Sequence, residues 1–185
     1  LLFVGLGNPT PDSENNRHNV GFKIIDSINK KFSLSKQKPK FKGLLTTGTI
    51  GSEKVYAIKP LTFMNNSGIC IRELIEYFKI DAGDVIVFHD DLDVEFGKIK
   101  AKFGGSSAGH NGIASIDKFI GKDYSRVRIG IGKPKNNVEV ADYVLQNFND
   151  DETAGIEKIS NFITDSISIL VEKKLDLFSS TVNNK

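Results

Sequence analysis

Residues 1–32 read LLFVGLGNPTPDSENNRHNVGFKIIDSINKKF, and this stretch decides the fold class. Its first six residues, Leu1–Leu6, are apolar and have the length of a strand buried on both faces. The polar segment Gly7-Asn8-Pro9 follows directly. Over His18–Phe32, apolar residues recur near helical spacing at Phe22, Ile25 and Ile28. A buried strand that leads into an amphipathic helix is the opening unit of an α/β domain.

The rest of the chain continues this alternation of strands and helices. Val85–Phe88 is short and wholly apolar, as expected for a strand covered on both faces. A last amphipathic helix carries its apolar face at Ile156, Ile159, Ile163, Ile167 and Leu170. Other strands are predicted at Phe41–Ile50, Val55–Lys59, Lys98–Phe103 and Val127–Ile131, and other helices at Ser67–Phe78, Gly112–Ile120 and Val138–Leu145. We therefore expect an α/β fold, a three-layer single domain with a mixed, mostly parallel central sheet flanked by helices.

Length and composition fit one globular domain. The chain has 185 residues, of which 39% are hydrophobic and 26% charged, and no internal repeat or low-complexity linker divides it. We expect one domain over residues 1–178, with segment 33–42 loose and residues 179–185 forming a flexible tail. The longest apolar runs are far too short to cross a bilayer, and no basic, then apolar leader precedes the first strand. These features predict a cytoplasmic protein without a membrane partner.

The single cysteine and the net charge exclude some classes of function. Cys70 stands alone, so neither an internal disulfide nor a site of several thiolates is available, and its apolar surroundings predict a small buried residue. The net charge of +2 does not by itself indicate a nucleic-acid-binding protein. Lysines nevertheless alternate along one predicted strand, at Lys98, Lys100 and Lys102. The denser lysines of residues 30–42 are interpreted as a solvated face.

Polar residues gather just after three of the apolar strands. Asn8 follows the first strand, Asn65 follows Val55–Lys59, and Asp90 follows Val85–Phe88. In open α/β sheets the ligand lies beyond the carboxyl ends of the strands. If the three strands are parallel neighbours, these side chains converge on one crevice, and His18 belongs on the same rim.

Such a group has a definite chemistry. A neutral histidine takes a proton from water near neutral pH, and an adjacent carboxylate fixes its tautomer. Amide donors from Asn8, Asn65 and Asn111 polarise a carbonyl, an effect worth roughly 3–4 kcal/mol per donor in known cases. Each residue alone is more often a cap or a turn former. Their joint position at strand ends favours the catalytic interpretation.

Three other patterns compete with it. Gly5-Leu6-Gly7 suggests a dinucleotide fingerprint, but Thr10 stands where the third glycine belongs. Residues 105–109 fit a G-x-S-x-G nucleophile motif, but no histidine lies after residue 110 to serve that serine. His89, Asp90, Asp91 and Asp93 suggest metal ligands, yet alternate residues of an extended segment point opposite ways. We therefore expect no cofactor and no metal.

Six short motifs occur in an order that carries a family resemblance. Together they are similar to the bacterial-type peptidyl-tRNA hydrolases, over about residues 2–150. The motifs are Val4-Gly5-Leu6-Gly7-Asn8-Pro9, Arg17-His18-Asn19, Thr62-Phe63-Met64-Asn65-Asn66-Ser67-Gly68, His89-Asp90-Asp91-Leu92-Asp93, Gly109-His110-Asn111-Gly112 and Arg128-Ile129-Gly130-Ile131-Gly132. Each is short, but the ordered set is specific.

The resemblance implies a monomeric, metal-free esterase without an obligate protein partner. Such an enzyme releases the peptide, or an N-acylated amino acid, from the 3′ end of tRNA, so that the tRNA is recycled after aborted translation. By resemblance, His18 is the base that activates water, Asp90 supports it, and Asn8 distinguishes an N-acylated group from a free amine. Phe63, Asn65 and Asn111 match substrate-binding positions.

The resemblance also gives the basic residues a partner. Lys100, Lys102 and Arg128 match positions that contact tRNA phosphates, where binding weakens as salt rises. The family usually has Tyr at Ser13 and Thr at Asn16, so the substrate contact of that Tyr is not carried over.

Two other functions stay open on the sequence. A non-catalytic RNA-binding module on the same fold has no need of His18 and Asp90 together with the three asparagines. A general small-ester hydrolase would leave the lysine face, and the face shared by Arg126 and Arg128, without a partner.

Overall fold

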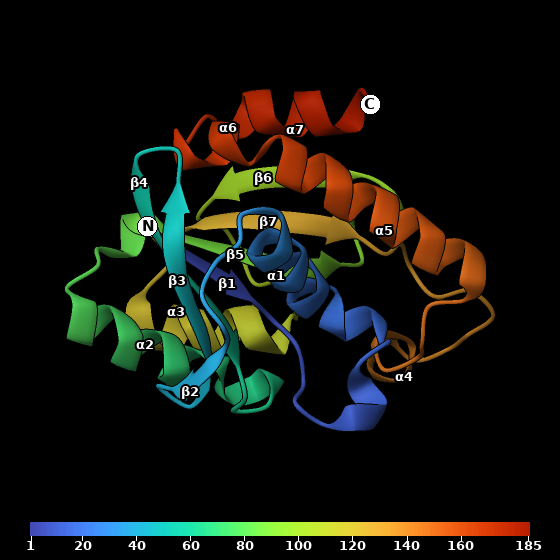
Figure 1. Ribbon diagram of the computed structural model, residues 1–185. Helices are drawn as coiled ribbons and strands as arrows, with labels where there is room; N and C mark the ends of the chain where they lie inside the picture. Colours follow the sequence, from blue (N-terminus) through green and yellow to red (C-terminus); the bar gives the residue numbers. More distant parts are fainter.

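The computed structural model describes all 185 residues and places one sheet at the centre of the molecule (Figure 1). None of its helices combines the length and the apolar character that crossing a bilayer requires. The strands are β1 Leu2–Gly5, β2 Lys38–Lys40, β3 Gly43–Ile50, β4 Glu53–Pro60, β5 Val85–Asp91, β6 Ile99–Phe103 and β7 Ser125–Gly130. The helices are α1 Val20–Lys31, α2 Ser67–Phe78, α3 Asn111–Ile120, α4 Val140–Val144, α5 Asp150–Asp165, α6 Ile167–Val171 and α7 Leu175–Asn183.

The seven strands form a mixed sheet in the order β2-β3-β4-β1-β5-β7-β6. Strand β1 pairs in parallel with β4 on one side and β5 on the other, and β5 pairs in parallel with β7. The outer strands β2, β3 and β6 run antiparallel to their neighbours. The three strands that carry polar residues at their ends are therefore parallel neighbours, as the expected crevice requires.

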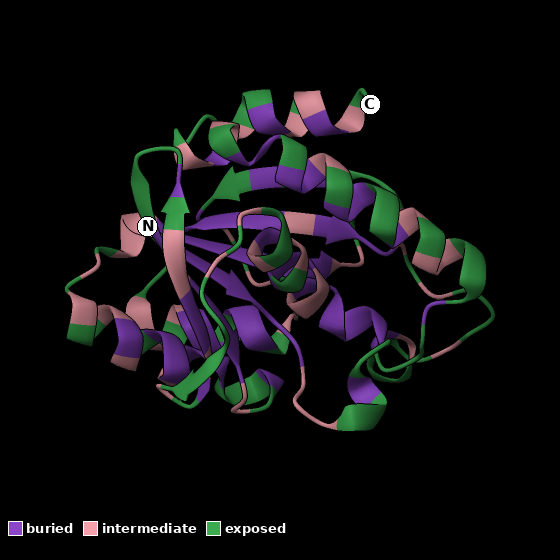
Figure 2. Cartoon of the chain, in the orientation of Figure 1, coloured by how far each residue is buried: buried purple, intermediate pink, exposed green.

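Helices cover both faces of the sheet and give the expected three layers. One apolar cluster joins the sheet to α1, α5, α6 and α7. The other joins it to α2 and α3. Strand β1 is buried along its whole length, and the purple centre of Figure 2 shows this layer between half-exposed helices. The predicted fold class is confirmed.

Strand β5 is longer than its apolar run. It extends to Asp91, because β7 continues beside it and pairs Asp90 with Ile129 and Asp91 with Gly130. The expectation that His89, Asp90 and Asp91 lie beyond the strand is therefore wrong. A strand ends where its backbone partner ends, and side-chain polarity does not report this point.

Two further expectations about the elements need correction. Segment 33–42, expected to be loose, contains the short edge strand β2, which pairs with β3. The expected last helix is divided, since α5 ends at Asp165 and α6 begins at Ile167. Its apolar face is nevertheless buried throughout, at Ile156, Ile159, Ile163, Ile167 and Leu170.

The expected flexible tail is largely helical. Helix α7 reaches Asn183 and buries Phe178 and Val182 against the core. Its polar side chains bond the free edge of β6: the Asn183 amide donates to Ile99 O at 2.7 Å and accepts from Ile99 N–H at 3.0 Å. Ser179 Oγ accepts from Ala101 N–H at 2.8 Å. One helical turn from Ser179 to Asn183 matches two residues of a strand, so α7 satisfies backbone groups that an edge strand leaves unpaired.

We predict that Asn183→Ala destabilises the fold by about 1–2 kcal/mol, because the backbone groups of the buried Ile99 lose both partners. Asn184→Ala is the matched control, since Asn184 is exposed and its side chain forms no hydrogen bond within the chain. The measurement is the urea midpoint of both variants and the parent. Equal midpoints for the two variants would show that the pairing contributes nothing.

Candidate active site

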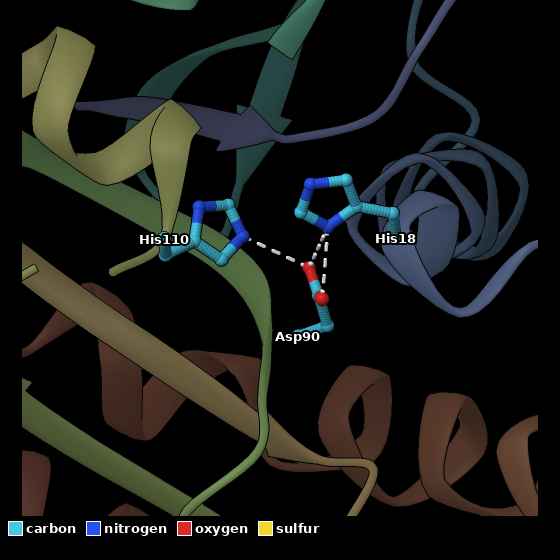
Figure 3. Close-up of side chains that lie close together, drawn as sticks. All are labelled: His18, Asp90 and His110. Carbon is cyan, nitrogen blue, oxygen red and sulfur yellow. Dashed lines mark hydrogen bonds and ion pairs between the residues drawn. The ribbon is translucent and has the colours of Figure 1, made fainter. Parts of the chain in front are cut away.

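A histidine–carboxylate–histidine group lies at the carboxyl end of the parallel strands (Figure 3). His18 Nδ1 lies 3.0 and 2.9 Å from the two carboxylate oxygens of Asp90. His110 Nε2 lies 2.9 Å from Asp90 Oδ1. The side chains of both histidines are about 9% exposed, and that of Asp90 is 2% exposed. Residues 72 and 20 positions from Asp90 thus meet on one buried carboxylate.

Two glycines bring His18 to this point. His18 lies in a 3₁₀ turn, Arg17–Asn19, that leads directly into α1. A Cβ on Gly5 would stand 2.2 Å from Gly21 O, and one on Gly21 would stand 2.4 Å from Phe88 O. Since any side chain would collide with backbone there, only glycine lets the first turn of α1 lie against β1 and β5. This close approach holds the turn beside Asp90.

Helix α3 fixes the tautomer of His110. His110 is the N-cap of α3, and its Nδ1 accepts from the backbone amides of Gly112 at 3.1 Å and Ile113 at 3.3 Å. The ring proton is therefore on Nε2, which donates to Asp90. Because Asp90 only accepts when ionised, His18 must also donate to it, from Nδ1. The Nε2 of His18 is left with a free lone pair.

Asp90 is held in its ionised form. Burial by itself would raise the pKa of this carboxyl, but the two histidines that donate to it lower the pKa well below its usual range. A permanent carboxylate keeps both histidine protons pointed inward, which fits a group that orients a base.

His89 is a third histidine next to this group, but it does not contact the Asp90 carboxylate. Its Nδ1 donates to the backbone oxygen of Asp90 at 2.8 Å, and its ring lies edge-on to that of His110 at 5.0 Å. Burial and the neighbouring His110 lower the pKa of His89 to about 3. His89 is therefore neutral at working pH and acts as part of the packing.

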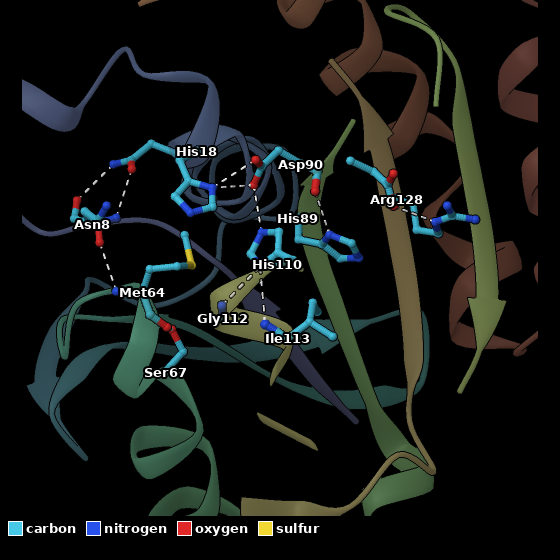
Figure 4. A network of polar contacts seen from close by, with 12 residues as sticks. Asn8, His18, Met64, Ser67, His89, Asp90, His110, Gly112, Ile113 and Arg128 are labelled. Carbon is cyan, nitrogen blue, oxygen red and sulfur yellow. Dashed lines mark hydrogen bonds and ion pairs between the residues drawn. The ribbon is translucent and has the colours of Figure 1, made fainter. Parts of the chain in front are cut away.

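Asn8 lies beside the group with its carbonyl oxygen already occupied (Figure 4). Asn8 Oδ1 accepts from Met64 N–H at 2.9 Å. The side chain of Asn19 bonds the Asn8 backbone in both directions, at 2.9 Å each. The side-chain nitrogen of Asn8, Nδ2, has no hydrogen-bond partner within the chain. It is therefore a fixed donor open to a ligand.

Phe63 and Asn65 follow β4 on the same rim. Phe63 has φ 59° and ψ 159°, a backbone region that costs a non-glycine residue about 1–3 kcal/mol, and its side chain is 53% exposed. Asn65 is exposed and its side chain forms no hydrogen bond within the chain. The strained turn presents both side chains outward, next to the Met64 amide that contacts Asn8.

Asn111 is the first residue of α3 and lines a cavity of about 690 Å³ with His18 and Asp90. The remaining walls come from residues 91–93, residues 107–110, the Lys133-Pro134 segment and α4. Asn8 and Asn65 are not among the residues that line it. Of the three asparagines, only Asn111 shares this cavity with His18.

A basic face lies on β7, the neighbour of β5, and on the edge strand β6. Lys100 and Arg128 stand opposite each other across the antiparallel pair, and Lys102 stands opposite Arg126. Lys100 and Lys102 are exposed, and the side chain of Arg128 is 24% exposed. Arg126 is buried, pairs with Asp117 at 3.0 Å and donates to two backbone carbonyls. Lys100 and Lys102 have no partner within the chain, and Arg128 is bonded through its Nε alone, to Asp91.

The comparison with known protein families decides the identity of this chain. The family model described as peptidyl-tRNA hydrolase matches residues 2–185. The chain belongs to the peptidyl-tRNA hydrolase family. It is 80% identical over 185 residues to a peptidyl-tRNA hydrolase of Pelagibacter ubique, with 100% of both chains covered. It is 43% identical over 183 residues to that of Ehrlichia canis, with 99% and 94% covered.

Solved structures agree with this assignment. The crystal structure of peptidyl-tRNA hydrolase from Acinetobacter baumannii superposes with a TM-score of 0.91 at 32% identity, covering 98% of this chain and 93% of that one. The chain is therefore an enzyme of a hydrolase family, as the ordered motifs predicted.

The candidate site of this peptidyl-tRNA hydrolase family member includes residues that sequence reasoning missed. His110 had appeared only within a motif, and Asn19 likewise, although both hold site residues in place. The residues preferred at an N-cap are Ser, Thr, Asp, Asn and Gly, so a histidine before the predicted helix gave no signal of this role. Nothing in the sequence indicates that its other nitrogen reaches Asp90.

His18, Asp90 and His110 also form the group that could hold a metal ion, since their ligand atoms lie within 4.8 Å of one another. A cation there would displace the proton from His110 Nε2 onto Nδ1. That atom already accepts from two backbone amides at the start of α3, and protonating it would break both bonds. These three side chains are therefore better arranged for hydrogen bonding to one another than for binding a metal ion.

Proposed function

We propose that this chain hydrolyses the ester between a peptide, or an N-acylated amino acid, and the 3′ end of tRNA, with water activated by His18. The observation that carries the proposal is the free Nε2 of His18, fixed by the Asp90 carboxylate that His110 also holds. Family membership supplies the substrate class. The released tRNA becomes available for recharging, in the cytoplasm where translation runs. One copy of the chain carries every residue named, so a monomer suffices.

The reaction follows from the direction of these hydrogen bonds. His18 Nε2 takes a proton from water while the water oxygen attacks the ester carbonyl carbon. Asp90 stabilises the imidazolium that forms. The tetrahedral intermediate then expels the 3′ oxygen of the terminal ribose, which receives the proton from His18. The peptide leaves with a free carboxylate.

Asparagine donors support this path on either side of His18. Asn65 and Asn111 are exposed amide groups at the rim, suited to hold the ester and the terminal nucleotide, and the exposed ring of Phe63 offers a stacking surface. Lys100, Lys102 and Arg128 would contact tRNA phosphates. A small-ester hydrolase has no use for this second, basic face.

Asn8 would distinguish an N-acylated aminoacyl group from one with a free ammonium. Because Met64 N–H occupies its carbonyl oxygen, Asn8 has only a donor to offer. That donor fits the carbonyl oxygen of an N-acyl group and opposes the positive charge of a free ammonium.

We predict that the parent enzyme cleaves N-acetyl-aminoacyl-tRNA and leaves free-amine aminoacyl-tRNA intact. Asn8→Asp replaces the free donor by an acceptor, keeps an oxygen for Met64, and is expected to lower kcat/KM for the acetylated substrate by roughly a hundredfold. The measurement is release of labelled amino acid from both substrates. Equal cleavage of the two by the parent would remove the proposed substrate. An RNA-binding module without catalysis would cleave neither.

A further inference from the structure

Asp91 connects the catalytic cavity to the basic face. It follows Asp90 on β5 and points away from it, as successive strand residues do. Its Oδ1 accepts from Asp93 N–H at 2.8 Å, and its Oδ2 accepts from Arg128 Nε–H at 2.7 Å. The carboxylate is about 10% exposed, so these two bonds fix it between a turn and a guanidinium.

Each partner of this ion pair belongs to a different hollow. Asp91 lines the cavity that contains His18 and Asp90. Arg128 of β7, labelled in Figure 4, lines a second depression of about 550 Å³ together with Lys100 and Lys102. A single charge-assisted hydrogen bond therefore sets where the phosphate-binding cation stands relative to the catalytic base.

We propose that Asp91 is a positioning residue that holds Arg128 by Nε and so presents both of its Nη groups to a tRNA phosphate. The inference rests on the proposed function, since it needs tRNA as the substrate. Neither Nη group has a partner within the chain, and two parallel N–H groups match two phosphate oxygens. Without its Nε partner, the flexible side chain would lose this orientation.

Charge alone would give the opposite effect. Asp91 carries a negative charge next to a site for phosphates, so removing it by Asp91→Asn would strengthen general attraction to tRNA. If positioning is the larger effect, the same substitution weakens binding. The sign of the change in KM therefore separates the two roles.

The test compares the parent with Asp91→Asn on two substrates. One is N-acetyl-aminoacyl-tRNA, and the other is 3′-(N-acetyl-aminoacyl)-adenosine, which has no phosphate. For the tRNA substrate we expect KM to rise roughly five- to tenfold while kcat stays within twofold. For the adenosine ester both constants should match the parent, which also shows that the variant is folded.

Two further variants isolate the contact. Asp93→Asn removes the same charge from the same turn without touching Arg128, and its KM for tRNA is expected to stay equal or fall. In an Arg128→Ala background, Asp91→Asn is expected to raise KM no further, because Asp91 then has nothing to position. The slope of log KM against log salt should also be lower by about one in Asp91→Asn.

Three results would overturn the positioning role. They are a lower KM for tRNA in Asp91→Asn, an equal rise in KM for the adenosine ester, and a full additional effect in the Arg128→Ala background. Failure of the proposed function would look different, because the parent enzyme would then cleave neither substrate.

Discussion

Replacing His18 by alanine is expected to lower kcat for N-acetyl-aminoacyl-tRNA by about ten-thousandfold. His18 is the one histidine lining the cavity that has a free basic nitrogen, since its Nδ1 is held by Asp90 and the Nδ1 of His110 is held by α3. Without it, water has no base and the departing 3′ oxygen has no acid. The measurement is the single-turnover rate of amino-acid release at saturating enzyme.

Binding and pH supply the controls for this result. His18→Ala removes no tRNA phosphate contact, so its affinity for tRNA should stay within a few-fold of the parent. The parent rate should fall as the pH is lowered, because a protonated base cannot accept the water proton. Asp90 does not contribute that fall, since its pKa is lowered and it stays ionised. A His18→Ala rate within tenfold of the parent would exclude His18 as the base.

Replacing Asp90 by asparagine is expected to lower kcat by about a thousandfold or more. Asparagine has the same shape, but it offers one accepting oxygen where two histidines donate. If His110 keeps that oxygen, the asparagine NH₂ faces His18 and requires Nδ1 to accept. The proton of His18 then moves to Nε2, where the lone pair is needed.

Two comparisons test this tautomer explanation. KM for tRNA should change little in Asp90→Asn, because the basic face is untouched. The double variant His18→Ala, Asp90→Asn should be no slower than His18→Ala alone, because the two residues act as one unit. Additive losses would mean that Asp90 contributes to catalysis by a route that does not pass through His18.

Local patterns were enough for the fold class. Helix α2 occupies Ser67–Phe78, the range that apolar periodicity predicts, because an amphipathic helix must bury one face. The wholly apolar run Val85–Phe88 likewise indicated a strand covered on both sides. Because β1 and β5 are parallel neighbours, the polar residues near their carboxyl ends were expected at one edge of the sheet. Asn8, His18 and Asp90 lie there.

Contacts between segments that are distant in the chain could not be predicted from such local patterns. The tail residues Ser179 and Asn183 look solvated in sequence, yet they bond the edge of β6 some 80 residues away. Arg126 and Arg128 alternate on one strand in the same fashion, but only the first finds an aspartate on α3 and becomes buried. Polarity alone does not distinguish a side chain that meets water from one that meets a backbone group.

The sequence by itself determined the layers of this protein, the edge of the sheet where the candidate site lies, and the family to which it belongs. Periodicity and strand-end residues carry that information because burial and chain direction are local properties. Only the tertiary structure decided that His110 shares Asp90 with His18, which ring nitrogen of His18 stays free, and that Asp91 holds Arg128. Those facts depend on hydrogen bonds between residues that are tens of positions apart in the chain. Such residues meet only once the chain is folded.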